Sequence, residues 1–379
     1  MIPFRSPVPR FAAGGDLFVG EGALVAIRAL AGTRVAVVHA PSVERDQAFM
    51  DQLGRAIAAP TLRFHRWQGG EPTVVGITAL AAELRAQRPD VIVAVGGGSV
   101  IDAARVAWML YEHPSMVLDG PGGPLAVPAL RGVARFAAVP TTAGAGAEVS
   151  SAVVLTDGEK RKMILVSGEF LPDLVILDPR AASGVPVTLL FQSLGDVLAH
   201  VVEGHCSRVA NPFVREMTRQ VFPRIWRVVM SCDVTADQLT SDQRLELMQL
   251  ALQGGWVQNH RPPGLGHAVA HALARIDVPH AIAAGLCLVP SLRVNLAHQV
   301  ARDALQDLAA TVGLTGADAL VDGIATGVRR IIPASASIRS RLGTEGPVVV
   351  ETALADVTAR TNPVPIDGDM VQRVLEALP

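Results

Sequence analysis

Residues 90–102 read DVIVAVGGGSVID and decide the fold class. The run 91–95 is continuously apolar, which is typical of a strand buried on both faces. Three glycines follow at 96–98, and the residues from 100 onward have helical spacing. Such a turn suits a phosphate, because glycines allow close backbone approach and a helix N-terminus offers free N–H groups and a positive dipole end. The alternative is a tight strand-to-helix turn that binds no ligand.

Further strands and a helix surround this turn in the first half of the chain. Apolar runs at 34–40, 134–140 and 173–178 are typical of strands, and 77–87 has helical spacing. Strand and helix in alternation predict a parallel α/β sheet. We therefore expect an α/β dinucleotide-binding domain of Rossmann-like type over residues 1–185.

After Pro186 the sequence changes character, and strand patterns almost vanish. Helix-compatible stretches occupy residues 189–207, 211–230, 241–258, 267–273, 303–312 and 369–378. We expect an all-helical domain over residues 186–379.

Composition excludes several classes of protein. The chain has 379 residues, of which 50% are hydrophobic. Its formal net charge is −2, and a charge so close to zero gives no reason to expect nucleic acid or an anionic membrane as a partner. No apolar run approaches the ~18 residues of a membrane span, and prolines and Asp16 interrupt the start of the chain where a signal peptide would be apolar. The cysteines Cys206, Cys232 and Cys287 lie far apart and suggest no disulfide framework. We expect a cytoplasmic protein.

A second group of residues has the pattern of a metal site. Asp196 and His200 lie four residues apart on an expected helix, as do His267 and His271, so each pair shares one helix face. His280 follows nearby. A carboxylate with imidazoles suits a divalent transition metal such as Fe(II) or Zn(II). Five residues exceed the four ligands of a simple site, and spacing alone does not identify which histidine is left over.

Two further segments carry groups that could bind a cofactor. PTTAGAGAEVS (140–150) follows an expected strand, and its hydroxyl groups could bond phosphate or ribose, although a surface loop would have the same composition. Lys162 is one of two lysines in the chain, and its ammonium could reach a ribose or a phosphate. A solvated turn is the alternative reading of that segment.

These motifs, in this order, resemble those of the iron-containing (group III) alcohol dehydrogenases. The resemblance runs from about residue 20 to the C-terminal tail, and the motifs that carry it are GGGSVID (96–102), PTTAGAGAEVS (140–150), KRKMILVSGEFLPDLVILDP (160–179), the Asp196/His200 helix with Glu203 and Gly204, HAVAH…PH (267–280) and TNPVPIDGDMVQRVLEAL (361–378). It implies the dehydroquinate synthase-like fold, with an N-terminal dinucleotide-binding domain and a C-terminal helical metal-binding domain.

The resemblance also implies a role for each candidate residue. Asp196, His200, His267 and His280 would bind the metal, and His271 would stand beside the substrate as a proton carrier. Gly97, Gly98 and Ser99 would cradle the pyrophosphate of NAD or NADP. The rest of the cofactor would lie against Thr141, Thr142, Ser150 and Lys162. The reaction implied is hydride transfer between NAD(P)(H) and a small alcohol or aldehyde, and the implied assembly is a homodimer.

Among the departures of the chain from the family pattern, three bear on the metal ligands, the cofactor and the substrate. The stretch from His271 to His280 is one residue shorter than usual. Residues 39–42, HAPS, lack the acidic residue that many NAD-preferring members have there, which leaves NADP(H) open. His260 and Arg261 precede the metal-binding helix, where the family is generally small and apolar; Arg261 could hold an anionic substrate or a peptide terminus, or could be an exposed loop residue.

Other functions compete with this reading. A metal-free reductase of the maleylacetate reductase type would keep the fold, but the intact Asp196 with three histidines argues against it. A lyase-type relative of dehydroquinate synthase would need charged substrate-binding residues that are not evident. A biosynthetic dehydrogenase for an anionic or peptide-borne hydroxyl group is a further alternative. A non-catalytic nicotinamide-binding sensor would have no need of a complete metal constellation.

Overall fold

The computed structural model describes residues 15–118, 127–158, 162–332 and 338–379. The chain divides into two compact units, Met1–Pro186 with Leu239–Leu252, and Val187–Gln238 with Gln253–Pro379. The domain boundary predicted near residue 185 stays a prediction. The two units change over at Pro186, but the segment Leu239–Leu252 groups with the first unit. Residues 1–14, which hold the prolines noted at the start of the chain, and Lys160 lie outside the described residues.

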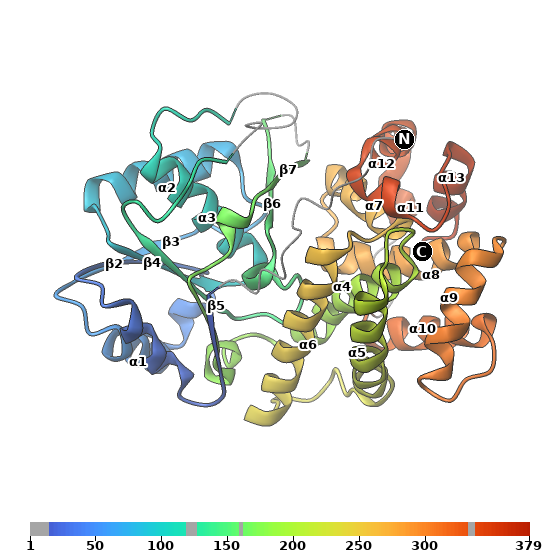
Figure 1. The fold of residues 1–379 in the computed structure, drawn as a ribbon, viewed down its shortest axis with the longest axis horizontal. Helices are drawn as coiled ribbons and strands as arrows, with labels where there is room; N and C mark the ends of the chain where they lie inside the picture. The colour runs from blue at the N-terminus through green and yellow to red at the C-terminus, as the bar shows by residue number, and fades with distance from the viewer. Residues whose placement is uncertain (1–14, 119–126, 159–161, 333–337) are drawn as a thin grey trace. The chain divides into compact units, whose positions relative to one another are not determined.

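The first unit is built on a parallel sheet of six strands, in the order β1-β8-β5-β4-β2-β3 (Figure 1). The strands are β1 (Asp16–Val19), β2 (Arg34–His39), β3 (Thr61–Arg66), β4 (Val91–Gly96), β5 (Arg135–Pro140) and β8 (Leu174–Leu177). The neighbouring strands β2, β4 and β5 are the apolar runs from which the sequence predicted a parallel sheet. That fold class is confirmed.

Both faces of this sheet are covered, which explains the unbroken apolar runs. Val35 and Val37 pack on one face in a core with η1 and α1, and Ala36 and Val38 pack on the other with α2 and α3. A strand with two buried faces has no polar side to alternate with. These helices are η1 (Ala23–Leu30, a 3₁₀ helix), α1 (Gln47–Ile57), α2 (Val74–Gln87) and α3 (Gly98–Glu112).

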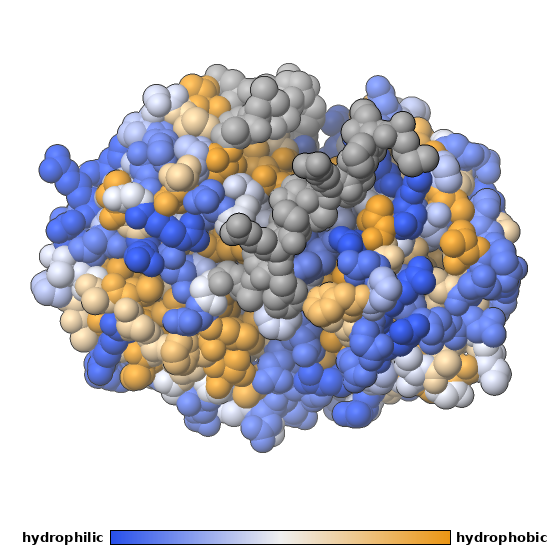
Figure 2. All heavy atoms as spheres, in the orientation of Figure 1, coloured by the Kyte–Doolittle hydropathy of each residue, from blue (hydrophilic) through white to orange (hydrophobic). Residues whose placement is uncertain are grey.

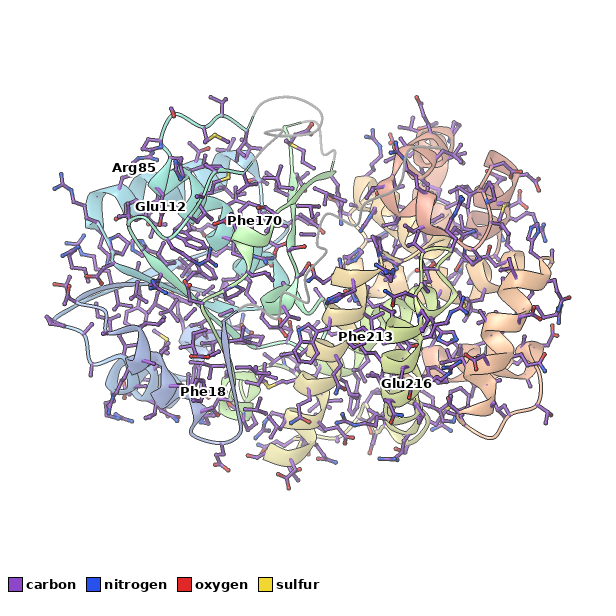
Figure 3. All side chains as sticks on the ribbon, in the orientation of Figure 1. Phe18, Arg85, Glu112, Phe170, Phe213 and Glu216 are labelled. Carbon is purple, nitrogen blue, oxygen red and sulfur yellow. The ribbon has the colours of Figure 1, made fainter. Side chains whose placement is uncertain are left out.

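A two-stranded hairpin lies beside α3 and was not expected from the sequence. Its antiparallel strands are β6 (Ala152–Thr156) and β7 (Lys162–Val166). Their buried side chains alternate with half-buried or exposed ones and join the core on the α3 face of the sheet. Phe170, labelled in Figure 3, is fully buried in the same core.

The second unit is helical, and its described residues contain no strand. Predicted helices are present with shifted ends, and α8, α10, α11 and α12 were not foreseen. The helices from Val187 to the C-terminus are α4 (Val187–Cys206), α5 (Pro212–Ser231), α6 (Ser241–His260), α7 (Leu265–Ala272), α8 (His280–Asn295), α9 (Gln299–Ala310), α10 (Ala317–Ile331), α11 (Ile338–Leu342), α12 (Gly346–Ala355) and α13 (Gly368–Glu376). Of these, α6 belongs to the first unit up to Leu252. Within this unit, α8 packs against both α4 and α7.

The surface carries hydrophilic and apolar residues side by side in the view of Figure 2. Within the described ranges, we find no helix with both the length and the apolar character needed to cross a bilayer.

A buried ion pair fastens the hairpin to α3. The Arg105 side chain is fully buried, pairs with Asp102 and donates to the carbonyl oxygens of Ser150 at 2.5 Å and Ala152 at 3.0 Å. Asp102 Oδ2 accepts from Val154 N at 2.9 Å. Burial raises the pKa of Asp102, and the charge of Arg105 opposes that rise. The pair therefore ties α3, which begins at the glycine turn, to β6.

We expect Arg105→Ala to lower the free energy of unfolding by about 3–5 kcal/mol, because it leaves the Asp102 carboxylate buried without a cation. Arg105→Lys keeps the charge and should lose less. Urea unfolding of both variants measures the difference. Equal stability of the alanine variant and the wild type would show that the pair does not hold the hairpin.

Candidate metal and cofactor sites

Three imidazole rings converge on one oxygen of Asp196. Asp196 Oδ1 lies 3.2 Å from Nε2 of His267, 3.5 Å from Nε2 of His200 and 3.5 Å from Nε2 of His280. Asp196 and His200 come from successive turns of α4, His267 comes from α7, and His280 is the first residue of α8. The two i, i+4 pairs in the sequence therefore contribute three of these four residues, and His280 supplies the fourth.

This cluster is buried, and its charges are strongly coupled. Burial by itself would raise the pKa of Asp196, but electrostatic interaction with the His200 and His280 rings and the hydrogen bond of His267 hold it well below its usual range. Burial lowers the pKa of His200 to about 3. Burial by itself would lower the pKa of His267, but hydrogen bonds to Asp196 and Glu203 raise it to about 9. An ionised carboxylate surrounded by imidazole nitrogen atoms has the chemistry of a cation site.

The donor atoms are close enough to share one ion. One ligand atom from each of Asp196, His267 and His280 lies within 4.8 Å of the others. His200 adjoins this trio, because its ring stacks on that of His267 at a centroid distance of 4.7 Å. The Nδ1 atom of His200 is buried and has no hydrogen-bond partner in the described part of the chain. Four residues with N and O donors at this spacing fit a divalent metal.

Glu203 lies behind His267. Its Oε2 atom is 2.6 Å from His267 Nδ1, and its Oε1 atom accepts from the backbone N of Gly266 at 2.7 Å. The side chain is 4% exposed, so these two contacts replace water. A carboxylate on Nδ1 fixes the ring and turns Nε2 toward Asp196, which is the usual arrangement behind a metal-bound histidine.

His271 stands beside the cluster and is held by a different carboxylate. Its ring stacks on that of His280 at a centroid distance of 5.1 Å and meets the His267 ring edge-on at 6.0 Å. Its Nδ1 atom lies 2.9 Å from Oδ2 of Asp356. His271 is not one of the residues whose ligand atoms lie within 4.8 Å of each other.

In the first unit, the glycine turn and the loop after β5 lie together. Gly96 pairs in register with Pro140, and Thr141 N donates to the carbonyl oxygen of Gly96 at 3.0 Å. A Cβ atom on Gly97 would lie 2.9 Å from Thr142 Oγ1, so no larger residue fits there without a shift of that side chain. Gly97 is also the N-cap of α3, where the first N–H groups have no partner within the helix.

The other predicted cofactor residues lie on neighbouring elements. Ser99 is in the first turn of α3. The Ser150 hydroxyl bonds the backbone of Ala152, while its carbonyl oxygen accepts from Arg105. Lys162 begins β7, where it is 8% exposed and forms an ion pair with Glu71 at 3.3 Å. The structure thus brings Gly97 and Thr142 together and gives Lys162 an acidic partner that the sequence did not indicate.

Two carboxylates of the helical cluster were missed as partners of histidines. Glu203 lies seven residues after Asp196 on the same helix, so helical periodicity could have placed it on the same face. Asp356 is 85 residues from His271, and no local pattern connects the two.

Comparison with known proteins places this geometry in a family. The model of the iron-containing alcohol dehydrogenases matches residues 15–179, and the model of the C-terminal domain of the Fe-containing alcohol dehydrogenase family matches residues 192–378. The NADPH-dependent butanol dehydrogenase of Clostridium saccharobutylicum is 26% identical over 97% of this chain and 97% of that protein. The 1-propanol dehydrogenase PduQ of Salmonella typhimurium is 26% identical over 96% of this chain and 97% of its own length.

A solved structure agrees. The iron-containing alcohol dehydrogenase from Thermococcus thioreducens superposes with a TM-score of 0.86 at 26% identity, over 96% of this chain and 98% of that one. The two family models together span both units of the chain and confirm the resemblance found in the sequence motifs. The chain belongs to the iron-containing alcohol dehydrogenase family and is an alcohol dehydrogenase.

Proposed function

We propose that the enzyme transfers hydride between NAD(P)(H) and a small alcohol or aldehyde with the help of one divalent metal ion. The proposed ligands of the metal are Asp196, His200, His267 and His280. The proposed metal is Fe(II), with Zn(II) as the alternative. The observation that carries the proposal is the convergence of three Nε2 atoms, at 3.2 to 3.5 Å, on a single buried oxygen of Asp196. A divalent cation there supplies a Lewis acid that polarises the carbon–oxygen bond of the substrate, while the nicotinamide supplies or accepts the hydride.

The residues of the chain divide the remaining work. Glu203 holds the His267 ring through Nδ1 and keeps Nε2 directed at Asp196. His271 carries the hydroxyl proton between the substrate and solvent, as its position beside His280 allows. No role beyond positioning is needed for Glu203, since its two oxygens are already engaged by His267 and Gly266.

The cofactor is proposed to lie with its pyrophosphate over Gly97, Gly98 and Ser99. Support comes from the free N–H groups at the start of α3 and from the close approach of Gly97 to Thr142. Thr141 and Thr142 border the same turn, and Ser150 and Lys162 are assigned to the ribose and nicotinamide end by family resemblance.

The end of β2 bears on the choice between NAD and NADP. Although residues 39–42 lack an acid, Glu44 lies 3.7 Å from Nε2 of His39 and 3.6 Å from the guanidinium of Arg66. A carboxylate favours a ribose hydroxyl and an arginine accommodates a 2′-phosphate, and here the two occur together. We therefore propose that the enzyme accepts both NAD(H) and NADP(H); the Clostridium saccharobutylicum relative is named as NADPH-dependent.

The names of the relatives favour small uncharged alcohols such as butanol and 1-propanol as substrates. Arg261 supports an anionic substrate as a second candidate. Its Nε atom is buried and has no hydrogen-bond partner among the described residues, and no acidic side chain of those residues pairs with it. A homodimer, on the ground of resemblance, and a cytoplasmic location, on the ground of the sequence pattern, complete the proposal.

We expect His267→Ala to lose bound metal and alcohol-dependent reduction of NAD(P) together, because His267 makes the shortest contact with Asp196. Metal analysis of purified protein and absorbance at the nicotinamide band measure both properties. A wild-type protein that is fully active without metal would overturn the proposed function in favour of the metal-free reductase.

His271→Ala should keep the metal and lose about 10²–10⁴-fold in rate, the usual contribution of a positioned acid or base. The same two measurements apply. Loss of metal in this variant would mean that the roles of His271 and His280 are wrongly divided.

Glu203→Gln should lower metal affinity about 10–100-fold, since an amide holds the Nδ1–H group of His267 less firmly than a carboxylate. Competition with a chelator measures the affinity. Glu216→Gln on α5 is a matched control, because Glu216 is 61% exposed and pairs only with neighbours on its own helix in the contacts described (Figure 3). Equal affinity of the two variants would exclude Glu203 from the support of the site.

A further inference from the structure

Asp356 pairs with His271 across 85 residues of sequence. The pair joins α7 to the segment between α12 and η8 (Val357–Thr361). Both side chains are 10% exposed, and Oδ2 of Asp356 lies 2.9 Å from Nδ1 of His271. The other oxygen, Oδ1, accepts from the backbone N of Thr358 at 2.8 Å and from its hydroxyl group at 2.6 Å. The carboxylate is therefore anchored at one oxygen and presents the other to the histidine.

The ionisation of Asp356 decides which ring nitrogen bears the proton. Burial alone would raise the pKa of Asp356, but the charge and hydrogen bond of His271 and the hydrogen bonds from the backbone and hydroxyl group of Thr358 lower it to about 2. An ionised carboxylate is only an acceptor, so Nδ1 of His271 must be the donor. In the neutral ring, the proton on Nδ1 leaves Nε2 as a free lone pair.

We propose that Asp356 is a positioning residue that holds His271 in its Nδ1–H tautomer and thereby makes Nε2 the atom that accepts and returns the substrate proton. The ring is also fixed by its stack on His280 at 5.1 Å and its edge contact with His267 at 6.0 Å, so the hydrogen bond sets the last degree of freedom, which is the flip of the imidazole. This inference rests on the proposed role of His271 as proton carrier.

The capping contact allows a selective test. Asp356→Asn keeps an oxygen that can accept from Thr358, because asparagine is as good a helix cap as aspartate. Its amide group then faces His271 as a donor and favours the tautomer with the proton on Nε2. Asp367→Asn is the matched control: Asp367 caps α13 by accepting from Met370 N at 2.9 Å, and no described histidine pairs with it.

We expect the ¹⁵N spectrum of zinc-loaded, histidine-labelled wild type to show His271 with the proton on Nδ1, the signal being assigned by its absence in His271→Gln. In Asp356→Asn that signature should be lost, with kcat lowered about tenfold or more, KM for the alcohol changed less than kcat, and metal content unchanged. Asp367→Asn should match the wild type in all four readouts.

A wild-type spectrum with the proton on Nε2 overturns the inference even if Asp356→Asn does not fold. An unchanged kcat in folded Asp356→Asn, where His271→Ala is slow, overturns it as well. Failure of the proposed function gives a different result. If the wild type shows no nicotinamide-dependent turnover, the proposed hydride transfer is wrong, whereas the ¹⁵N spectrum still shows which nitrogen of His271 bears the proton.

Discussion

One buried carboxylate oxygen constrains the helical unit. Asp196 is 1% exposed, and an isolated charge at such a depth would be costly. The three Nε2 atoms that surround Oδ1 are what make its ionised state stable, and their electrostatic and hydrogen-bond interactions lower its pKa against the effect of burial. α4, α7 and α8 must therefore meet within a few ångströms, because each supplies a partner of this oxygen.

Two glycines allow that approach. A Cβ atom on Gly195, the residue before Asp196, would lie 2.9 Å from the carbonyl oxygen of Ala281 and 3.2 Å from the Cα atom of Gly285. The backbones of α4 and α8 thus touch where the carboxylate and His280 face each other, and any side chain at either glycine would separate them. Packing and chemistry are set by the same short stretch of two helices.

The sequence predicted what local periodicity determines. Val91 to Val95 and the glycines after it identified β4 and the start of α3, and the spacing of Asp196 and His200 placed both on one helix face. The β6–β7 hairpin was not predicted because its strands are only five residues each and three positions in each strand are not fully buried. Asp356 escaped for a different reason, since its partner is fixed by tertiary packing between α7 and the chain after α12.

His267 and His271 have the same local chemistry and different proposed roles. Both come from α7, and each has Nδ1 next to a buried carboxylate, Glu203 at 2.6 Å in one case and Asp356 at 2.9 Å in the other. Each carboxylate turns Nε2 away from itself. For His267 that nitrogen lies 3.2 Å from Asp196 Oδ1, whereas the described ion pair of His271, one turn later, is with Asp356. One turn of helix therefore separates the proposed metal ligand from the proposed proton carrier, because it decides whether an oriented imidazole reaches the buried oxygen.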